Sequence, residues 1–205
     1  EIYDGGVGSN PSNLTSYSFG ATPIEALVFT AEDAADGVAL WQLTGDAGPA
    51  LVPGTTNFSP DQLTPFRDGT NDAKLFFVAT ATGTGRELYS TSDLSSVTPA
   101  ADVLSGNDSS NPTHLMEFDG RLFFVASDPT DKGEELYYYD PDTTSHERIT
   151  DVAPGPLGSD IEQLTQVTAS NGDDLLFFAA TNQSEGTELY RVSTGLARAT
   201  VTPPG

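Results

Sequence analysis

The sequence has no cysteine, so no disulfide can stabilise the fold and no thiol chemistry is available. Basic residues are also scarce: eight lysines and arginines face thirty acidic residues, and the formal net charge is −22. Nucleic acids and anionic membrane surfaces both attract clustered basic residues, so we exclude both as partners. No apolar run approaches the roughly 18 residues of a membrane-spanning helix, and we expect no membrane insertion.

Catalytic motifs are missing as well. The sequence contains no nucleophile elbow, no zinc-protease helix motif and no phosphate-binding loop. Its two histidines, His114 and His146, stand in different repeats and at different positions of the repeat described below. We expect His114 to make a surface hydrogen bond, and we expect the chain to be non-catalytic.

A repeat of about fifty residues runs through the chain, because a glycine precedes a leucine by nine residues in four places. The four pairs are Gly5 and Leu14, Gly54 and Leu63, Gly106 and Leu115, and Gly155 and Leu164. Periods of this length are typical of propellers, solenoids and arrays. The predicted repeats cover about residues 6–54, 55–106, 107–155 and 156–205, with residues 1–5 pairing near the last repeat.

Two apolar runs follow each leucine. The first is rich in phenylalanine and covers residues 27–31, 75–79, 122–126 and 176–180. The second begins with glycine, ends with tryptophan or tyrosine, and covers residues 37–41, 85–89, 133–137 and 186–190. The first run is apolar at consecutive positions, as in a strand that is covered on both faces. Turn residues separate the runs and no long segment keeps a helical period, so the sequence predicts an all-β fold.

Each repeat offers four candidate strands. In the first repeat the first strand is expected at Leu14–Phe19, and in the third repeat the fourth is expected at Arg148–Val152. Four antiparallel strands per repeat, arranged radially, make a β-propeller. We therefore expect residues 1–205 to form one domain, a closed four-bladed β-propeller in which Ile2–Tyr3 pairs beside the last strand. The alternative is four blades of a larger ring or an open array.

Three segments carry a family resemblance: Gly8–Thr15, Leu176–Ala180 and Gly186–Tyr190 resemble the ELW-type repeats of secreted and surface proteins from bacteria. Those repeats have a Gly-Ser-Pro-Leu-Thr loop, a Phe-Ala strand and a Gly-Thr-Glu-Leu-Trp strand. In this chain, tyrosine replaces tryptophan in three repeats, and Ala39 replaces the glutamate in the first. The resemblance implies a propeller-like fold and an extracellular, cell-surface or periplasmic location, and it implies no reaction.

The turn between the two apolar runs is acidic in the first and third repeats. Asp33 and Asp36 lie in one of these turns, and Asp128 and Asp131 lie in the other. Calcium binds six to eight oxygens, often several from one loop, so these aspartates are candidate metal ligands and calcium is the candidate cofactor. Each turn offers only two or three side-chain oxygens, however, and Asp-Gly pairs first of all indicate hairpins.

Three glutamates, Glu87, Glu135 and Glu188, stand at one position of the third strand in three repeats. In a closed ring, equivalent positions surround the axis, so these residues are candidates for a ring of negative charge around a central channel. The other interpretation is a carboxylate that binds backbone groups or an arginine between blades. Ala39 at this position of the first repeat argues against a symmetric site.

These observations favour a non-catalytic binding or interaction module outside the cytoplasm. Rigid scaffolds such as propellers present loops, and loops carry function. The expected partners are a protein or glycan ligand, or other subunits of a larger extracellular assembly. Two alternatives stay open: a carbohydrate-active enzyme with acidic residues at the propeller mouth, and a structural spacer of an adhesin. The high negative charge by itself favours solubility.

Overall fold

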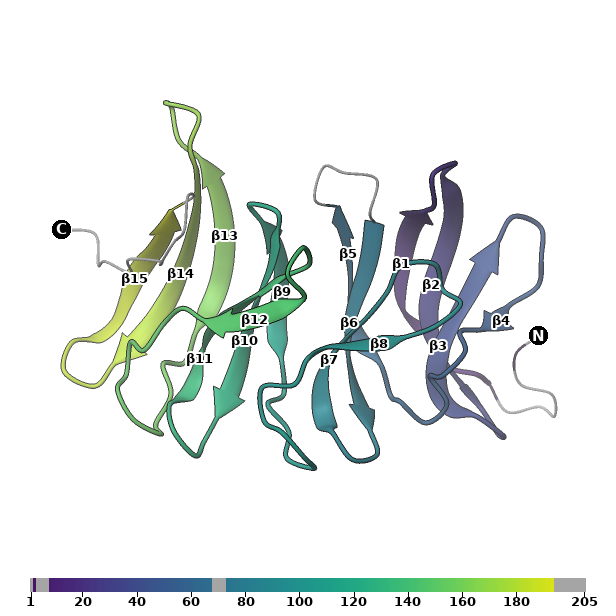
Figure 1. Cartoon of the computed structure of the whole chain (residues 1–205), viewed down its shortest axis with the longest axis horizontal. Helices are drawn as coiled ribbons and strands as arrows, with labels where there is room; N and C mark the ends of the chain where they lie inside the picture. Colours follow the sequence, from purple (N-terminus) through teal and green to yellow (C-terminus); the bar gives the residue numbers. More distant parts are fainter. Residues whose placement is uncertain (1, 3–7, 68–72, 194–205) are drawn as a thin grey trace. The chain divides into compact units, whose positions relative to one another are not determined.

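The computed structural model describes residues 2, 8–67 and 73–193 (Figure 1). These residues form four antiparallel β-sheets and no helix. One sheet falls in each of the four repeats, and the predicted all-β class is confirmed. In the described part of the chain, no helix is long and apolar enough to cross a membrane.

Strands that follow one another in the chain are neighbours in every sheet. The first sheet contains β1 (Ser12–Phe19), β2 (Ile24–Asp33), β3 (Gly37–Thr44) and β4 (Ala50–Leu51). The second contains β5 (Asp61–Arg67), β6 (Ala73–Ala81), β7 (Gly85–Thr91) and β8 (Thr98–Ala101). The third contains β9 (Thr113–Phe118), β10 (Arg121–Asp128), β11 (Gly133–Asp140) and β12 (Ser145–Arg148). The fourth contains β13 (Glu162–Thr168), β14 (Asp174–Asn182) and β15 (Gly186–Ser193).

The repeats match in backbone conformation as well as in sequence. The residue before the repeated leucine has a positive φ in all four repeats, at Asn13, Gln62, His114 and Gln163. The pairing of the first strand with the second is irregular at the same place in every sheet. Positive φ is uncommon outside glycine, and bulges of this kind re-aim side chains. The four leucines therefore occupy equivalent sites.

The chain divides into two compact units, one up to Ser109 and one from Ser110 onward, and each unit holds two sheets. In the first unit, Val28 of β2 and Leu40 of β3 share one buried cluster with Leu75 and Phe77 of β6. The hydroxyl of Tyr17 in β1 lies 3.1 Å from the carbonyl oxygen of Ala73 and 2.9 Å from that of Ser92, so polar contacts also join the two sheets.

The second unit repeats this packing. Phe123 of β10 and Leu136 of β11 share a buried cluster with Leu176 and Phe178 of β14. In both units, the later sheet contributes the first, third and fifth residues of its Phe-rich run. The earlier sheet contributes the second residue of its run in the first unit, and the second and fourth residues in the second unit. We call the side that carries the second and fourth residues the even face of a sheet, and the opposite side its odd face. Within each unit, an even face packs on an odd face.

The burial of the central phenylalanines is confirmed. Phe77, Phe124 and Phe178 are fully buried, and Phe29 is nearly so. A buried strand that is apolar at every position has both faces in contact with other groups, because side chains alternate between the two faces of a sheet.

The fourth strand of the third repeat differs from its predicted position. It runs over Ser145–Arg148 and not over Arg148–Val152, so the two ranges share only Arg148. Beyond β12, the hydroxyl of Thr150 accepts the hydrogen bond of the Leu136 N–H, at 2.8 Å. A side chain thus takes the place of a strand carbonyl, and the ladder ends there.

Some predictions about the ends of the chain fall on residues outside the described part. Tyr3 and residues 194–205, which would hold the fourth strand of the last repeat, are among them. Ile2 is described, and it packs against the buried cluster of Phe29 and Trp41 in the first sheet. A single closed four-bladed ring stays a prediction of the sequence.

Gly133 provides a test of the packing around the third strand. A Cβ at Gly133 would overlap the backbone nitrogen of Gly158, whereas a Cβ at the equivalent Gly186 would meet nothing within 4 Å. Both glycines have a positive φ, so an alanine at either position costs about 1–2 kcal/mol of backbone strain. We expect Gly133→Ala to lower the free energy of unfolding by about 1–3 kcal/mol more than Gly186→Ala does. Equal losses in urea titrations of the two variants would contradict the packing of the Gly158 loop.

Candidate functional site

The aspartates predicted as metal ligands in the first repeat take part in turn and loop hydrogen bonds. Asp33 Oδ1 accepts the N–H of Ala35 at 2.7 Å, which closes an Asx turn. Asp36 Oδ1 accepts the hydroxyl of Thr56 at 3.2 Å. These bonds hold the hairpin and the loop beside it.

The third repeat uses its aspartates in a similar way. Asp128 Oδ1 accepts the N–H and the hydroxyl of Thr130, at 3.0 and 2.6 Å. Asp131 lies 4.0 Å from Lys132 Nζ and from Arg148 Nη1. Among the described residues, no three His, Cys, Asp or Glu side chains are grouped so that they could hold a metal ion. Calcium binding by Asp33, Asp36, Asp128 and Asp131 stays a prediction.

Glu135 is fully buried beneath the segment that follows β12. Its carboxylate accepts hydrogen bonds from the hydroxyls of Thr150 and Ser159 and from the N–H of Val152. The Ser159 hydroxyl in turn accepts the N–H of Ala153, at 3.0 Å. Burial raises the pKa of Glu135 above its ordinary value, and the hydrogen bonds oppose that shift. The carboxylate of Glu135 therefore holds the loop after β12 against β11 through hydrogen bonds.

The equivalent positions in the other repeats differ in burial. Glu87 is buried and accepts the N–H of Val103 at 3.2 Å, in the same manner as Glu135. Glu188 is exposed, and the residues that would correspond to Val103 fall in residues 194–205, outside the described part. These contacts agree with the backbone-binding interpretation of Glu87 and Glu135; the arrangement of all three around an axis stays a prediction.

The first repeat compensates for Ala39. The Thr55 hydroxyl accepts the N–H of Leu40 at 3.1 Å and donates to the carbonyl oxygen of Val52 at 2.7 Å. Thr150 in the third repeat also accepts an N–H from β11, but it donates to Glu135. Where the glutamate is missing, a backbone carbonyl oxygen accepts the hydrogen bond of the threonine hydroxyl. Sequence reasoning missed these threonines, which follow the third-strand leucines that they bind by 15 residues in the first repeat and by 14 in the third.

The histidines are peripheral. His114 is exposed, and its Nδ1 lies 3.1 Å from the hydroxyl of the neighbouring Thr113. His146 is exposed in β12. This agrees with the expected surface hydrogen bond of His114.

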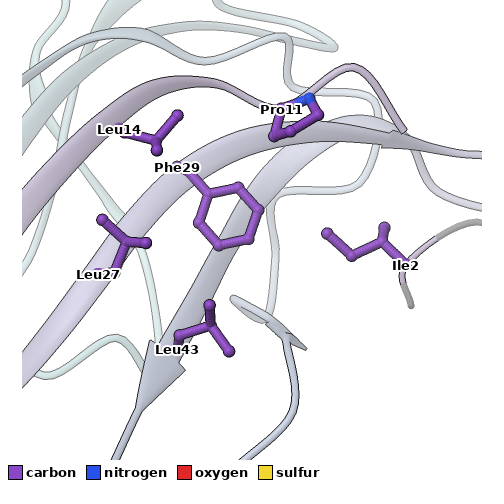
Figure 2. A pocket seen from close by; sticks show the side chains of 6 residues that line it. All are labelled: Ile2, Pro11, Leu14, Leu27, Phe29 and Leu43. Atoms are coloured by element: carbon purple, nitrogen blue, oxygen red, sulfur yellow. The ribbon is translucent and has the colours of Figure 1, made fainter. Parts of the chain in front are cut away.

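An apolar pocket of about 260 Å³ lies on the odd face of the first sheet. Figure 2 shows the ring of Phe29 in the middle, with Leu14 and Leu27 on one side and Ile2 on the other. Pro11 and Leu43 complete the lining, which contains no polar side chain. Leu14 is 64% exposed even though it lines the pocket. We call this surface the Phe29 face.

Trp41 lies beside Phe29 on this face, because the two residues are cross-strand partners in β2 and β3. Its indole Nε1 is buried and has no hydrogen-bond partner among the described residues. Tyr89 takes the equivalent position in the second sheet, and its hydroxyl lies 2.7 Å from that of Thr84. A buried donor without an acceptor is costly, and the equivalent tyrosine of the second sheet avoids this cost.

A second pocket, of about 360 Å³, lies on the even face of the fourth sheet. Its apolar residues are Val167 of β13, Phe177 and Ala179 of β14, and Leu189 of β15. Gln163 and Thr165 add uncharged polar groups. Val167 is 45% exposed and Leu189 is 47% exposed. We call this surface the Phe177 face.

The linings of both pockets are uncharged, although Arg191, the cross-strand partner of Phe177, lies on the same side of the fourth sheet. The residues that line the two pockets include no Asp, Glu, Lys or Arg, although the chain has thirty acidic residues and a net charge of −22. Contiguous exposed apolar patches usually mark interaction sites. The sequence predicts that the Phe-rich strands are apolar on both faces, but nothing in it singles out the first and last sheets as candidate sites.

Comparisons with known proteins concern the fold. No protein-family model matches the chain, and no curated protein matches it. The structure is similar to that of TolB from Acinetobacter baumannii, with a TM-score of 0.50 and 18% sequence identity. The match covers 87% of this chain and 41% of TolB, so the chain spans about two-fifths of that protein. At this identity the likeness shows the fold alone, which is β-propeller-like.

Two further structures, both from Bacteroides thetaiotaomicron VPI-5482, are more distant. An endo-1,4-β-xylanase matches with a TM-score of 0.45 and 16% identity over 94% of this chain and 74% of its own. An endo-arabinase matches with a TM-score of 0.42 and 11% identity over 98% of this chain and 78% of its own. Neither carries an argument about the function of this chain.

Glu135 generates a prediction about pH. Because burial raises its pKa in the folded state, the folded protein holds more protons than the unfolded chain between pH 4.5, its ordinary pKa, and the raised value. Its contribution to stability is therefore fully present below pH 4.5 and is lost as the pH rises through the folded pKa. We expect Glu135→Gln to remove this decline from urea titrations at a series of pH values.

Glu188→Gln is the matched control, because it removes the same charge at the same repeat position from an exposed site. We expect Glu188→Gln to keep the pH profile of the natural protein. Parallel profiles for Glu135→Gln and the natural protein would refute the role of Glu135.

Proposed function

We propose that this chain is a non-catalytic, extracytoplasmic interaction module that recognises protein through the apolar faces of its first and last sheets. The observation that carries the proposal is the pair of uncharged pocket linings on a chain with a net charge of −22. The buried centres of protein–protein interfaces are depleted in charged residues and enriched in aromatic ones. Phe29 and Phe177 occupy such positions.

The chemistry of the Phe29 face favours protein over glycan as the ligand. Sugar hydroxyls need hydrogen-bond partners when they leave water. The Phe29 pocket is lined only by aliphatic, proline and phenylalanine side chains, which offer none. A volume of about 260 Å³ suits an apolar side chain such as Leu, Met or Phe from a partner protein.

The buried glutamates support a non-catalytic role. A catalytic carboxylate must reach its substrate, whereas Glu135 and Glu87 are buried and accept hydrogen bonds from this chain's own backbone. Their positions explain why acidic residues recur in the third strand without invoking a reaction. The extracytoplasmic location is supported by the resemblance to ELW-type repeats.

The proposal is tested by two arrays probed with the labelled protein. One array carries peptides that contain Leu, Met or Phe, and the other carries soluble glycans. We expect the protein to bind apolar peptides, and we expect Leu14→Asp to reduce this binding at least about tenfold, because the new carboxylate would be desolvated in the complex. Leu157→Asp makes the same change at another exposed leucine, outside both faces, and should bind as the natural protein does.

Two results would overturn the proposal. One is binding to glycans that Leu14→Asp leaves unchanged, with no peptide bound. The other is turnover of a glycan substrate.

A further inference from the structure

We propose that the Phe177 face of one copy of this chain docks on the Phe29 face of a second copy. This inference rests on the proposed function and names the partner: another molecule of the same protein, joined end to end.

The first argument is the pairing rule within each unit. In the first unit, the even face of the first sheet packs on the odd face of the second. In the second unit, the even face of the third sheet packs on the odd face of the fourth. The Phe29 face is an odd face, and the Phe177 face is an even face. The two end faces are therefore the two halves of an interface that the chain already forms twice.

The Phe29 face matches the packed odd faces residue by residue. Its key residues are Leu14, Leu27 and Phe29. The equivalents are Leu63, Leu75 and Phe77 in the second sheet and Leu164, Leu176 and Phe178 in the fourth, all of which pack in the buried clusters. The Phe29 face thus presents the shape on which an even face already packs elsewhere in the molecule.

The Phe177 face matches the packed even faces in the same way. Its key residues are Val167, Phe177 and Leu189. The equivalents are Tyr17, Val28 and Leu40 in the first sheet and Phe118, Phe123 and Leu136 in the third, and all six are buried. On the Phe177 face, by contrast, Val167 and Leu189 remain close to half exposed. A residue that is buried in two repeats and exposed in a third indicates a missing partner.

The net charge of the chain makes association between copies depend on salt concentration. Two molecules at −22 repel one another over the Debye length, which is about 10 Å at 0.1 M salt and about 3 Å at 1 M. The residues that line the two pockets carry no charge, so burying these linings removes no charged group from water. Association should therefore strengthen as salt is added, in contrast to an interface built on ion pairs.

The pairing is heterologous, because two different faces meet. Such contacts join molecules head to tail and produce rings or open chains instead of dimers alone. We expect the natural protein to form dimers and larger species in about 1 M sodium chloride, with a mass that grows with protein concentration.

The test uses two variants, and each variant has one of the two faces blocked by a carboxylate. Leu14→Asp blocks the Phe29 face and Val167→Asp blocks the Phe177 face, and both residues are exposed enough to accept a carboxylate without unfolding. We expect each variant alone to weaken association about 100-fold or more in sedimentation experiments, because its charge would be buried in the contact. An equimolar mixture of the two variants should form a dimer and nothing larger, since it retains one intact pair of faces. Leu157→Asp should associate as the natural protein does.

The outcomes separate the inference from its alternatives. A natural protein that stays monomeric at every concentration overturns the inference, and so does a mixture that stays monomeric. If the variants instead lose thermal stability as monomers, the two faces close within one molecule, and the end-to-end contact is refuted. In either case, the proposed function would still hold if peptides bind the natural protein and do not bind Leu14→Asp. Failure of peptide binding by the monomeric Val167→Asp variant, whose Phe29 face is free, would count against the proposed function itself.

Discussion

The structure depends on one constraint: its central strands are apolar on both faces, so every sheet must be covered on both sides. Strands such as β6, with Leu75, Phe76, Phe77 and Val78 in succession, cannot leave one face in water without a large hydrophobic cost. Within each unit, the chain meets this constraint by packing the even face of one sheet on the odd face of the next. On the first and last sheets, the faces outside this packing carry the exposed residues Leu14, Val167 and Leu189, and we propose that a partner covers these faces.

Much of this architecture could be predicted from the sequence, because it depends on local patterns that recur. One sheet per repeat, with Phe77 and Phe178 buried, follows from three recurring features. These are the Phe-rich run, the glycine at the start of the third strand, and the leucine nine residues after a glycine. The fourth strands were harder to predict. They are short, and in the third repeat the strand ends at Arg148: Ile149 still donates to the carbonyl oxygen of Leu136, but the Thr150 side chain accepts the Leu136 N–H. No residue pattern predicts where a side chain will replace a backbone group as the hydrogen-bond partner of a strand.

The candidate sites show the same division. Acidic turns and repeated glutamates are visible in the sequence, but their roles depend on burial and on partners far along the chain. Glu135 is held by Thr150 and Ser159, which follow it by 15 and 24 residues; Thr150 falls in the segment predicted as the fourth strand, and Ser159 lies in the loop beyond it. The end faces could not be recognised from the sequence, because the residues of the Phe29 face have the same character as those buried inside each unit. Only the structure distinguishes Leu14, which is exposed, from Leu63, which packs in the core.

The central claim is that the end faces pair by the rule that joins the internal sheets, and photo-crosslinking tests it most directly. A benzoylphenylalanine in place of Leu27 would sit in the Phe29 pocket. Crosslinking in a mixture of isotopically labelled and unlabelled copies, followed by peptide mass spectrometry, would identify what lies against it. We expect crosslinks between copies to the peptide that contains Phe177 or the one that contains Val167. Crosslinks between copies to any other surface, or none between copies under conditions in which the protein associates, would contradict it.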